Sequence, residues 1–383
     1  MQHVHFSGWL ECGKTAYMPS LVDHDLNSLQ QELVTAGCNP IHAAVVLRHF
    51  YAQNGRLELR ELAIGRAASE HLVQRLSERR SRIVQKHVAA DGTTKLLIAF
   101  NGEGGAVESV LMPGYRQGVA AGCVSSQIGC AMGCDFCAST RNGLQRNLEA
   151  GEIVEQFLHL KEQASAIGRR LKTLVFMGMG EPLLNFESVI SAIRRIADPQ
   201  IGSLGWRQVT VSTVGIVPAI DRLAAENLNV HLALSLHAPD DETRSRLVPA
   251  NRRYAVADVM AATRRFEKTT GRIPTIEYCL LAGVNDSDRQ ATLLADLMWS
   301  FHAHVNLIPY NAIGRGVSGT VYARPSAERM QAFIDVLRDR GVCAHFRDAR
   351  GDDVNAACGQ LRESAISSEG SSFVELTGAS GVV

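Results

Sequence analysis

The stretch Gly-Cys-Ala-Met-Gly-Cys-Asp-Phe-Cys at residues 129–137 decides how the rest of this chain is interpreted. Its cysteines, Cys130, Cys134 and Cys137, have the spacing C-x-x-x-C-x-x-C. Four cysteine thiolates normally hold a 4Fe-4S cluster. Three thiolates leave one iron with a position for a ligand that is not protein. This arrangement indicates a 4Fe-4S cluster that binds S-adenosylmethionine and cleaves it to a radical.

A zinc site and three incidental thiols are the alternative interpretations of this stretch. Structural zinc usually has four ligands, supplied as two separated pairs. The chain has no second C-x-x-C pair, and Cys123 lies seven residues before the first cysteine of the motif. The spacing therefore favours the cluster.

The composition is that of a soluble globular protein with more than one domain. The chain has 383 residues, 46% hydrophobic and 20% charged, with 39 basic and 39 acidic side chains. A net charge of zero means that local patches would have to bind any nucleic acid. The first ten residues do not resemble a secretory signal, and no apolar run reaches the roughly 18 residues of a membrane span. We expect a cytoplasmic protein with no membrane partner, and nine cysteines with one tight cluster fit a reducing compartment.

Two regions with different patterns follow one another along the chain. Residues 27–36 and 40–53 carry apolar side chains at helical spacing, and residues 95–100 and 107–112 are apolar runs joined by a glycine-rich turn. They predict a small α+β accessory domain at residues 1–112.

From about residue 118, expected strands alternate with expected helices, which predicts an α/β fold with a parallel sheet. Polar motifs follow the strands, and this favours a partial (β/α) barrel over an open sheet. The core is expected at residues 113–361 and a flexible tail at 362–383. The expected strands are 121–126, 173–177, 208–212, 229–235, 275–280 and 304–308, and the expected helices are 150–166, 186–196 and 327–340.

Several of these strand-end motifs suit S-adenosylmethionine. In Gly178-Met179-Gly180-Glu181-Pro182, the backbone can bind the methionine amino group and Glu181 can accept from it; a simple turn is the alternative. Ser212, the run Ser235-Leu236-His237 and Asn311 also follow strands, where they could contact the cofactor's ribose and carboxylate. A helix cap for the serines and a buried core position for His237 are the alternatives.

Thiols and basic residues also occur outside the cysteine motif. Cys358 lies in a loop rich in glycine and aspartate, where an exposed, reactive thiol is expected, with a cysteine of no role as the alternative. Basic residues cluster near residues 75–86 and 252–272, as RNA contacts or as solvated helix faces. Tyr254 and Phe266 could stack on unpaired bases. Four further cysteines are interpreted as packing residues: Cys12, Cys38, Cys279 and Cys343.

Six motifs together resemble one family: the cysteine stretch, Arg-Asn-Leu-Glu-Ala-Gly-Glu-Ile-Val-Glu-Gln, Gly-Met-Gly-Glu-Pro-Leu, Ser-Leu-His-Ala-Pro, Val-Asn-Leu-Ile-Pro-Tyr-Asn and Arg-Gly-Asp-Asp-Val-Asn-Ala-Ala-Cys-Gly-Gln-Leu. They are similar to the radical S-adenosylmethionine (radical SAM) RNA adenine methyltransferases, RlmN and its relative Cfr. The likeness covers about residues 40–361. It implies a partial barrel of the radical SAM type, with residues 1–112 as an RNA-binding accessory domain.

The resemblance also assigns roles to residues. It implies that Cys130, Cys134 and Cys137 hold the 4Fe-4S cluster. Cys358 would accept a methyl group, Cys123 would resolve the intermediate, and Glu108 would accept a proton. The implied S-adenosylmethionine contacts are Gly180, Glu181, Ser212, Ser235, Leu236, His237 and Asn311.

The implied reaction methylates an adenine at ring carbon 2 in 23S rRNA, with tRNA as a second substrate. One S-adenosylmethionine methylates Cys358, a second is cleaved to a radical that activates this methyl group, and product release leaves a transient disulfide. The implied partners are RNA and an electron donor such as flavodoxin, and the chain would act as a monomer. The alternatives are methylation at carbon 8, a non-catalytic RNA-binding iron–sulfur protein, and a radical enzyme with a small-molecule substrate.

Two stretches depart from the family pattern. The segment between Glu108 and Cys123 is about two residues longer than usual. After Asn311 the chain reads Ala-Ile-Gly-Arg-Gly-Val-Ser-Gly, where a Pro-Phe-Pro-Gly run is common. Both changes could alter RNA selection or the ring carbon that is targeted.

Overall fold

The computed structural model of this chain describes residues 20–361 apart from 77–78, 102–104, 203 and 348–349. The expected tail at 362–383 and Cys12 therefore lie outside the described residues. No helix in the described part of the chain is long and apolar enough to cross a membrane.

One ten-stranded sheet organises the molecule, in the order β1-β2-β3-β4-β7-β8-β9-β10-β11-β12. Its first four strands pair antiparallel and all later neighbours pair parallel. Because the order ends at β1 and β12 without joining them, the barrel is partial. The antiparallel strands are β1 (Ser81–Val88), β2 (Thr94–Phe100), β3 (Ala106–Pro113) and β4 (Val119–Cys123). The other parallel strands are β7 (Arg170–Phe176), β8 (Val209–Thr213), β9 (His231–Ser235), β10 (Thr275–Leu280), β11 (His304–Pro309) and β12 (Ala344–Phe346).

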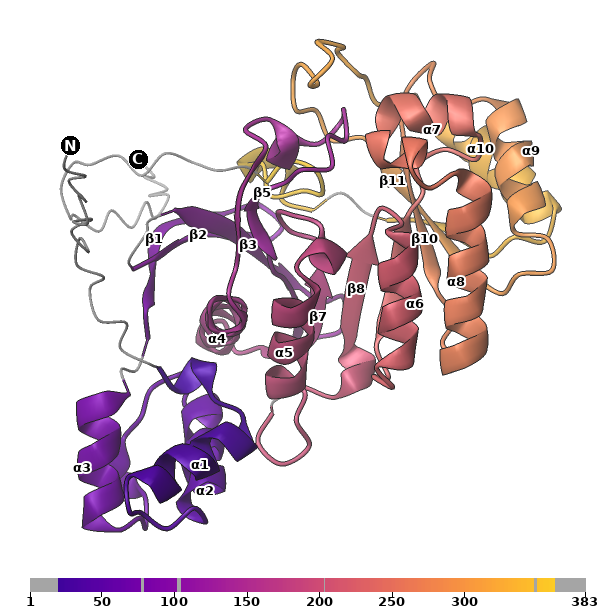
Figure 1. Ribbon diagram of the computed structural model, residues 1–383. Coiled ribbons are helices and arrows are strands. Elements are labelled where there is room, and N and C mark those ends of the chain that lie inside the picture. The colour runs from indigo at the N-terminus through magenta and orange to yellow at the C-terminus, as the bar shows by residue number, and fades with distance from the viewer. Residues whose placement is uncertain (1–19, 77–78, 102–104, 203, 348–349, 362–383) are drawn as a thin grey trace, which may run out of the picture.

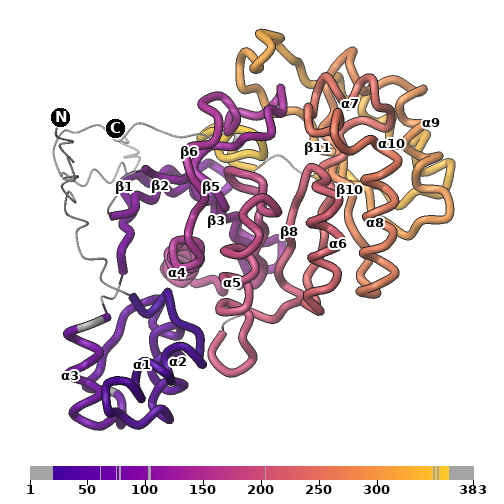
Figure 2. Tube along the Cα trace, in the orientation of Figure 1, coloured from indigo at the N-terminus to yellow at the C-terminus, as the bar shows by residue number. Residues whose placement is uncertain are grey.

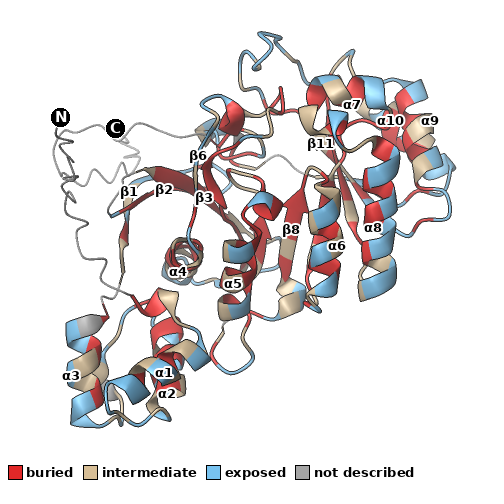
Figure 3. Ribbon diagram, in the orientation of Figure 1, coloured by how far each residue is buried: buried red, intermediate tan, exposed pale blue. Residues whose placement is uncertain are grey.

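Helices connect the parallel strands and cover the outer face of the sheet (Figure 1). In α5, apolar residues at positions 186, 189, 190 and 193 form one buried stripe, which is the spacing of an amphipathic helix. Figure 3 shows the same division, with buried strands and exposed outer helix faces. These helices are α4 (Ala150–Ala166), α5 (Phe186–Ile196), α6 (Val217–Ala225), α7 (Asp241–Leu247), α8 (Val256–Thr270), α9 (Asp288–Leu297) and α10 (Ala327–Asp339).

A short hairpin flanks the cysteine loop. Its strands are β5 (Gln127–Gly129) and β6 (Leu144–Asn147), and Figure 2 shows them beside the segment that follows β12. The loop between these strands carries all three cysteines of the motif. The hairpin therefore holds both ends of the loop together.

The accessory region combines three helices with the antiparallel strands. The helices are α1 (Leu26–Thr35), α2 (His42–Ala52) and α3 (Arg66–Arg75). Arg79 forms an ion pair with Glu162 of α4 (3.0 Å), and Arg80 forms one with Asp23 (2.6 Å). These two arginines of the first basic cluster therefore join the accessory helices to the core instead of forming an open RNA patch. The expected boundary at residue 112 falls at the end of β3, inside the shared sheet.

The predicted order of elements is confirmed, and their ends differ by a few residues. The expected strand at 121–126 ends at Cys123, because the backbone beyond it bonds to the turn after β7: Ser126 N donates to Met179 O (2.9 Å). Phe266 is fully buried in the core, so the expectation that it stacks on RNA bases is wrong.

Candidate functional site

The three motif cysteines line one cavity at the carboxyl ends of the parallel strands. Cys130 and Cys134 are buried, and Cys137 is half-buried. Cys130 N donates to Gly143 O (2.9 Å), and Asp135 N donates to Leu247 O (3.0 Å), which fixes both arms of the loop. The structure brings six of the other predicted residues to the same cavity: Gly180, Glu181, Ser212, Ser235, His237 and Cys358.

The three thiols suit an iron–sulfur cluster better than a single metal ion. Among the described residues, the one group of three potential ligands close enough to share one ion lies elsewhere on the chain. Burial and, for Cys134, the neighbouring thiolates of Cys137 and Cys130 raise the pKa of these thiols, that of Cys130 to about 12. Thiols bind iron as thiolates, so cluster binding must release protons here. Three thiols that line one cavity but are not close enough to share one ion fit a cluster of several irons.

The turn after β7 is locked against the segment that leads to the cysteines. Gly180 has φ +98°, and a Cβ there would lie 2.6 Å from the Cβ of Gln127, so only glycine fits. Glu181 N donates to Gln127 Oε1 (2.8 Å), and Met179 N donates to Ser125 Oγ (2.9 Å). These bonds fix the turn to the segment that leads into the cysteine loop.

The Glu181 carboxylate faces this cavity with backbone donors on both oxygens. It accepts from Leu183 N (3.0 Å) and Val214 N (2.8 Å). Burial raises its pKa to about 7, although these hydrogen bonds oppose the rise. A buried carboxylate of this kind suits the ammonium group of S-adenosylmethionine.

The ends of β8 and β9 supply the next polar groups. Ser212 Oγ and Ser235 Oγ are 3.2 Å apart and both line the cavity. His237 has φ +61°. Its Nδ1 accepts a hydrogen bond from Cys279 N (3.0 Å), which holds the imidazole ring against β10. Burial, helped by the charge of Arg244, lowers its pKa to about 3, which keeps the imidazole neutral. The Leu236 side chain packs in the core and does not line the cavity.

The loop that carries Cys358 is tied to the cysteine loop. Ala138 N donates to Gly359 O (2.7 Å), and Ser139 Oγ donates to Leu361 O (2.6 Å). Asn311 Nδ2 donates to the carbonyl of Cys358 itself (3.3 Å). These bonds place the exposed Cys358 at the rim of the cavity.

Cys123 and Glu108 lie on the face of the sheet that meets the Cys358 loop. Cys123 and Lys95 each pair with Val110, and Glu108 is two residues from Val110, so these side chains share one face. Lys95 Nζ lies 3.0 Å from Glu108 Oε1 and donates to Asn355 O (3.3 Å) in the Cys358 loop.

The electrostatics link the two thiols outside the motif. Burial and the charge of Cys358 raise the pKa of Cys123 to about 12, so it is a neutral thiol near pH 7. Both thiols are free in this structure. The structure therefore brings both thiols and Glu108 to the same side of the sheet.

Three residues at the cavity were not identified from the sequence. Arg347, just after β12, lies 3.7 Å from Glu277 Oε2, and the charges of Cys358 and then Glu277 raise its pKa. Glu277 and Cys279 lie on one face of β10 and both line the cavity. Cys279 packs in a hydrophobic cluster, as expected, and it lines the cavity as well. Glu277 could have been identified from the sequence, because it is an acidic residue inside an otherwise apolar strand. No sequence pattern marks Arg347.

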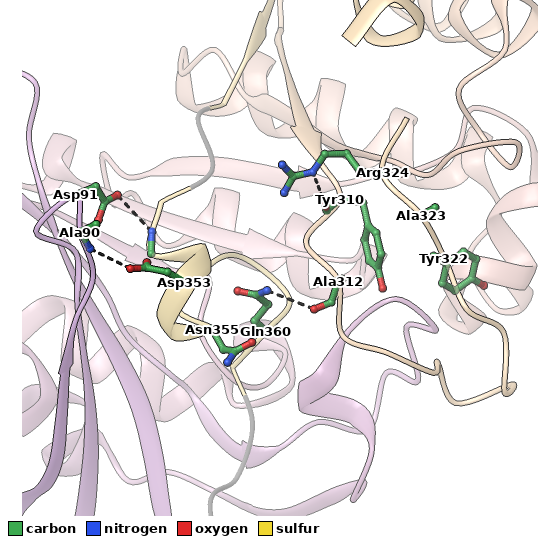
Figure 4. Close-up of a pocket in the computed structure, with 11 residues that line it drawn as sticks. Ala90, Asp91, Tyr310, Ala312, Tyr322, Ala323, Arg324, Asp353, Asn355 and Gln360 are labelled. Carbon is green, nitrogen blue, oxygen red and sulfur yellow. Dashed lines mark hydrogen bonds between the residues drawn. The ribbon is translucent and has the colours of Figure 1, made fainter. Parts of the chain in front are cut away.

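A wider groove, with a volume of about 780 Å³, adjoins the inner cavity (Figure 4). Tyr310 lines both hollows, and the Cys358 loop separates them, with Gly359 on the inner side and Gln360 on the outer side. Ala90 N donates to Asp353 Oδ2 (3.0 Å), and Gly351 N donates to Asp91 Oδ2 (3.3 Å), across the far wall. The groove therefore runs between the turn that joins β1 to β2 and the mouth of the barrel.

Comparison with known proteins agrees with this geometry. Residues 124–295 match the Radical SAM superfamily. The chain is 52% identical over 348 residues to "Probable dual-specificity RNA methyltransferase RlmN 1" of Opitutus terrae, covering 90% of this chain and 97% of that one. It is 46% identical over 287 residues to an RlmN of Moorella thermoacetica, covering 73% and 79%. The crystal structure of a radical SAM methyltransferase from Sphaerobacter thermophilus superposes with a TM-score of 0.84 at 41% identity, covering 90% and 99%.

The fold and the cysteine site thus define a radical SAM enzyme, whose cofactors are a 4Fe-4S cluster and S-adenosylmethionine. Within that class, the chain belongs to the RlmN family of RNA methyltransferases.

Proposed function

We propose that this chain methylates an adenine of RNA at ring carbon 2, with 23S rRNA and tRNA as substrates. The observation that carries the proposal is the position of Cys358. Its loop lies between the inner cavity, which suits the cofactors, and the outer groove, which is open to a large substrate. A thiol at that boundary can take a methyl group from one side and present it to the other.

The residues have the following proposed roles at the cofactors. Cys130, Cys134 and Cys137 hold the cluster, which supplies the electron that cleaves S-adenosylmethionine to a radical when both are bound. Glu181 and the backbone at Gly180 bind the methionine amino group. Ser212, Ser235, His237 and Asn311 contact the rest of the cofactor, and Leu236 contributes through its backbone, because its side chain is in the core.

The chain's own thiols would carry the methyl group. Cys358 sulfur forms a bond to the methyl carbon and loses its proton, while the bond from that carbon to the sulfonium of S-adenosylmethionine breaks and S-adenosylhomocysteine leaves. The Arg347 guanidinium, whose pKa is raised chiefly by Cys358, stabilises the negative charge of that thiolate. Glu108 then takes the proton that leaves the adenine ring.

Release of the product is the proposed role of Cys123. Its sulfur bonds to Cys358 sulfur while the bond between Cys358 sulfur and the product carbon breaks. Because the pKa of Cys123 is raised to about 12, this thiol stays protonated until the reaction provides a base. Such a thiol would be protected from premature disulfide formation.

RNA would reach the groove along the accessory strands. Arg82 and Lys86 of β1 are exposed, whereas Arg79 and Arg80 are only partly exposed. Tyr115, which lies beside Arg350, exposes 79% of its surface. Cations and an exposed aromatic ring suit phosphates and unpaired bases. An electron donor such as flavodoxin would reduce the cluster, and the enzyme would act as a monomer.

Mass spectrometry of nucleosides from RNA treated with the reconstituted enzyme tests the proposal. We expect 2-methyladenosine in 23S rRNA and tRNA, and Cys123→Ala should accumulate a covalent protein–RNA adduct through Cys358. Detection of 8-methyladenosine would show carbon 8 as the target. Deoxyadenosine without any methylated RNA would contradict the RNA substrate.

A further inference from the structure

A second cluster of potential metal-binding side chains lies at the amino ends of β11 and β12, on the same face of these strands as Asn306 and Ile308. His304 begins β11, Cys343 directly precedes β12 and His345 lies within β12, and all three are exposed. Their ligand atoms lie within 4.8 Å of one another. The expectation that Cys343 is a packing residue is therefore wrong.

Parallel pairing of β11 with β12 places these side chains together. Val305 pairs with Ala344, Asn306 pairs with His345, and Val305 N donates to Cys343 O (2.9 Å). Val305 and Ala344 are buried beneath the cluster. The ligands thus project from a fixed part of the sheet.

The distances match those around a tetrahedral zinc ion. His304 Nδ1 lies 3.2 Å from Cys343 Sγ, and Cys343 Sγ lies 3.4 Å from His345 Nε2. Zinc bonds of about 2.3 Å to sulfur and 2.0–2.1 Å to nitrogen place neighbouring S and N ligands about 3.5 Å apart. A thiolate with two imidazoles is a donor set that binds zinc in preference to magnesium or calcium.

This cluster is separate from the iron–sulfur site. The inner cavity is lined by Ile308 and Tyr310 at the carboxyl end of β11, whereas His304 is at its amino end. Strands advance about 3.3 Å per residue, so roughly 13 Å separates His304 from Ile308.

We propose that His304, Cys343 and His345 bind one Zn²⁺ ion, with water as the fourth ligand. β12 has three residues and forms one end of the sheet, and Arg347 and the Cys358 loop follow it. An ion held by β11 and β12 fastens this last strand to its one neighbour. The site therefore has a structural role in positioning Arg347.

Zinc X-ray absorption on the cluster-loaded enzyme tests this proposal, because iron then occupies the three motif cysteines. With one equivalent of Zn²⁺, we expect one sulfur at about 2.3 Å and two imidazole nitrogens at about 2.0–2.1 Å. Cys343→Ser and His345→Ala should each weaken zinc binding at least 100-fold and remove the rise in melting temperature that zinc causes. Their iron content should not change.

His302→Ala and Cys38→Ser serve as matched controls, since His302 is exposed near the same strand and Cys38 is a partly exposed cysteine elsewhere. Both should bind zinc like the parent protein. Zinc without a sulfur ligand, zinc with several sulfur ligands, or unchanged binding by Cys343→Ser would each overturn the proposal.

Discussion

The cysteine loop and the Cys358 loop meet at one cavity, but they are held in different ways. The cysteine loop combines bonds between its own residues, from Cys137 N to Cys134 O and from Cys130 N to Gly143 O, with distant bonds such as that from Asp135 N to Leu247 O. The Cys358 loop depends on distant partners, since Asp353 accepts from Ala90, 263 residues earlier. A loop fixed in part by its own residues can be identified from a short motif, whereas a loop that depends on the accessory strands acquires its position only when the whole sheet has formed.

Replacing one thiol in each loop should give the largest difference between the two loops, in iron content and in methyl transfer. Cys358→Ala removes the proposed methyl acceptor but none of the cluster ligands, so methyl transfer should be abolished while iron content and brown colour remain. Cys130→Ala should lose both the cluster and the activity. Iron analysis and nucleoside mass spectrometry measure the two effects. Methylated RNA from Cys358→Ala would refute the covalent intermediate.

The turn packed against the cysteine loop predicts a pH dependence of S-adenosylmethionine binding. Burial raises the pKa of Glu181 to about 7, so its carboxylate is ionised above that pH and neutral below it. Affinity should fall up to about tenfold per pH unit below 7, and it should fall again above roughly pH 8 as the ligand's amino group loses its proton.

Glu181→Gln should bind more weakly and lose the dependence near pH 7, as measured by equilibrium binding to the cluster-loaded enzyme. If the affinity of this variant still fell below pH 7, a group other than Glu181 would be responsible for the pH dependence.

Weakening the distant support of the Cys358 loop should have a smaller effect. Lys95→Met removes the ion pair to Glu108 and the hydrogen bond to Asn355. We expect methyl transfer to slow about tenfold, roughly 1.4 kcal/mol in the barrier, with unchanged S-adenosylmethionine binding. Lys172→Met, at an exposed position of β7, is the control and should leave both the rate of methyl transfer and S-adenosylmethionine binding unchanged. Equal loss of cofactor binding in Lys95→Met would show that the two loops are not separable.

The smallest effect is expected at the outer edge of the accessory sheet. The double variant Arg82→Ala, Lys86→Ala removes two exposed charges from β1. RNA affinity should fall a few-fold, and the salt dependence of binding should become shallower by about one to two counterions. Binding titrations at several salt concentrations measure both. An unchanged salt slope would place the RNA on another surface.

The same difference explains what could be predicted from the sequence. The cluster motif, the order of strands and the Gly-Met-Gly-Glu-Pro turn depend on short-range spacing. The pairing of Glu277 with Arg347, and the contact of Lys95 with both Glu108 and Asn355, depend on strand neighbours that no local pattern specifies. Phe266 was misjudged because an aromatic residue beside arginines on a helix does not reveal which face packs inward.

The open sheet has a consequence for what can react. Because β1 and β12 are not joined, the described sheet does not close into a full barrel, and the outer groove lies between the β1–β2 turn and the mouth. For an RNA substrate, the ribose–phosphate chain could remain in bulk water while one nucleobase leaves its stack, at a cost of about a few kcal/mol. We expect reactivity to follow the ease of unstacking, so that adenines in hairpin loops react faster than adenines in perfect duplexes.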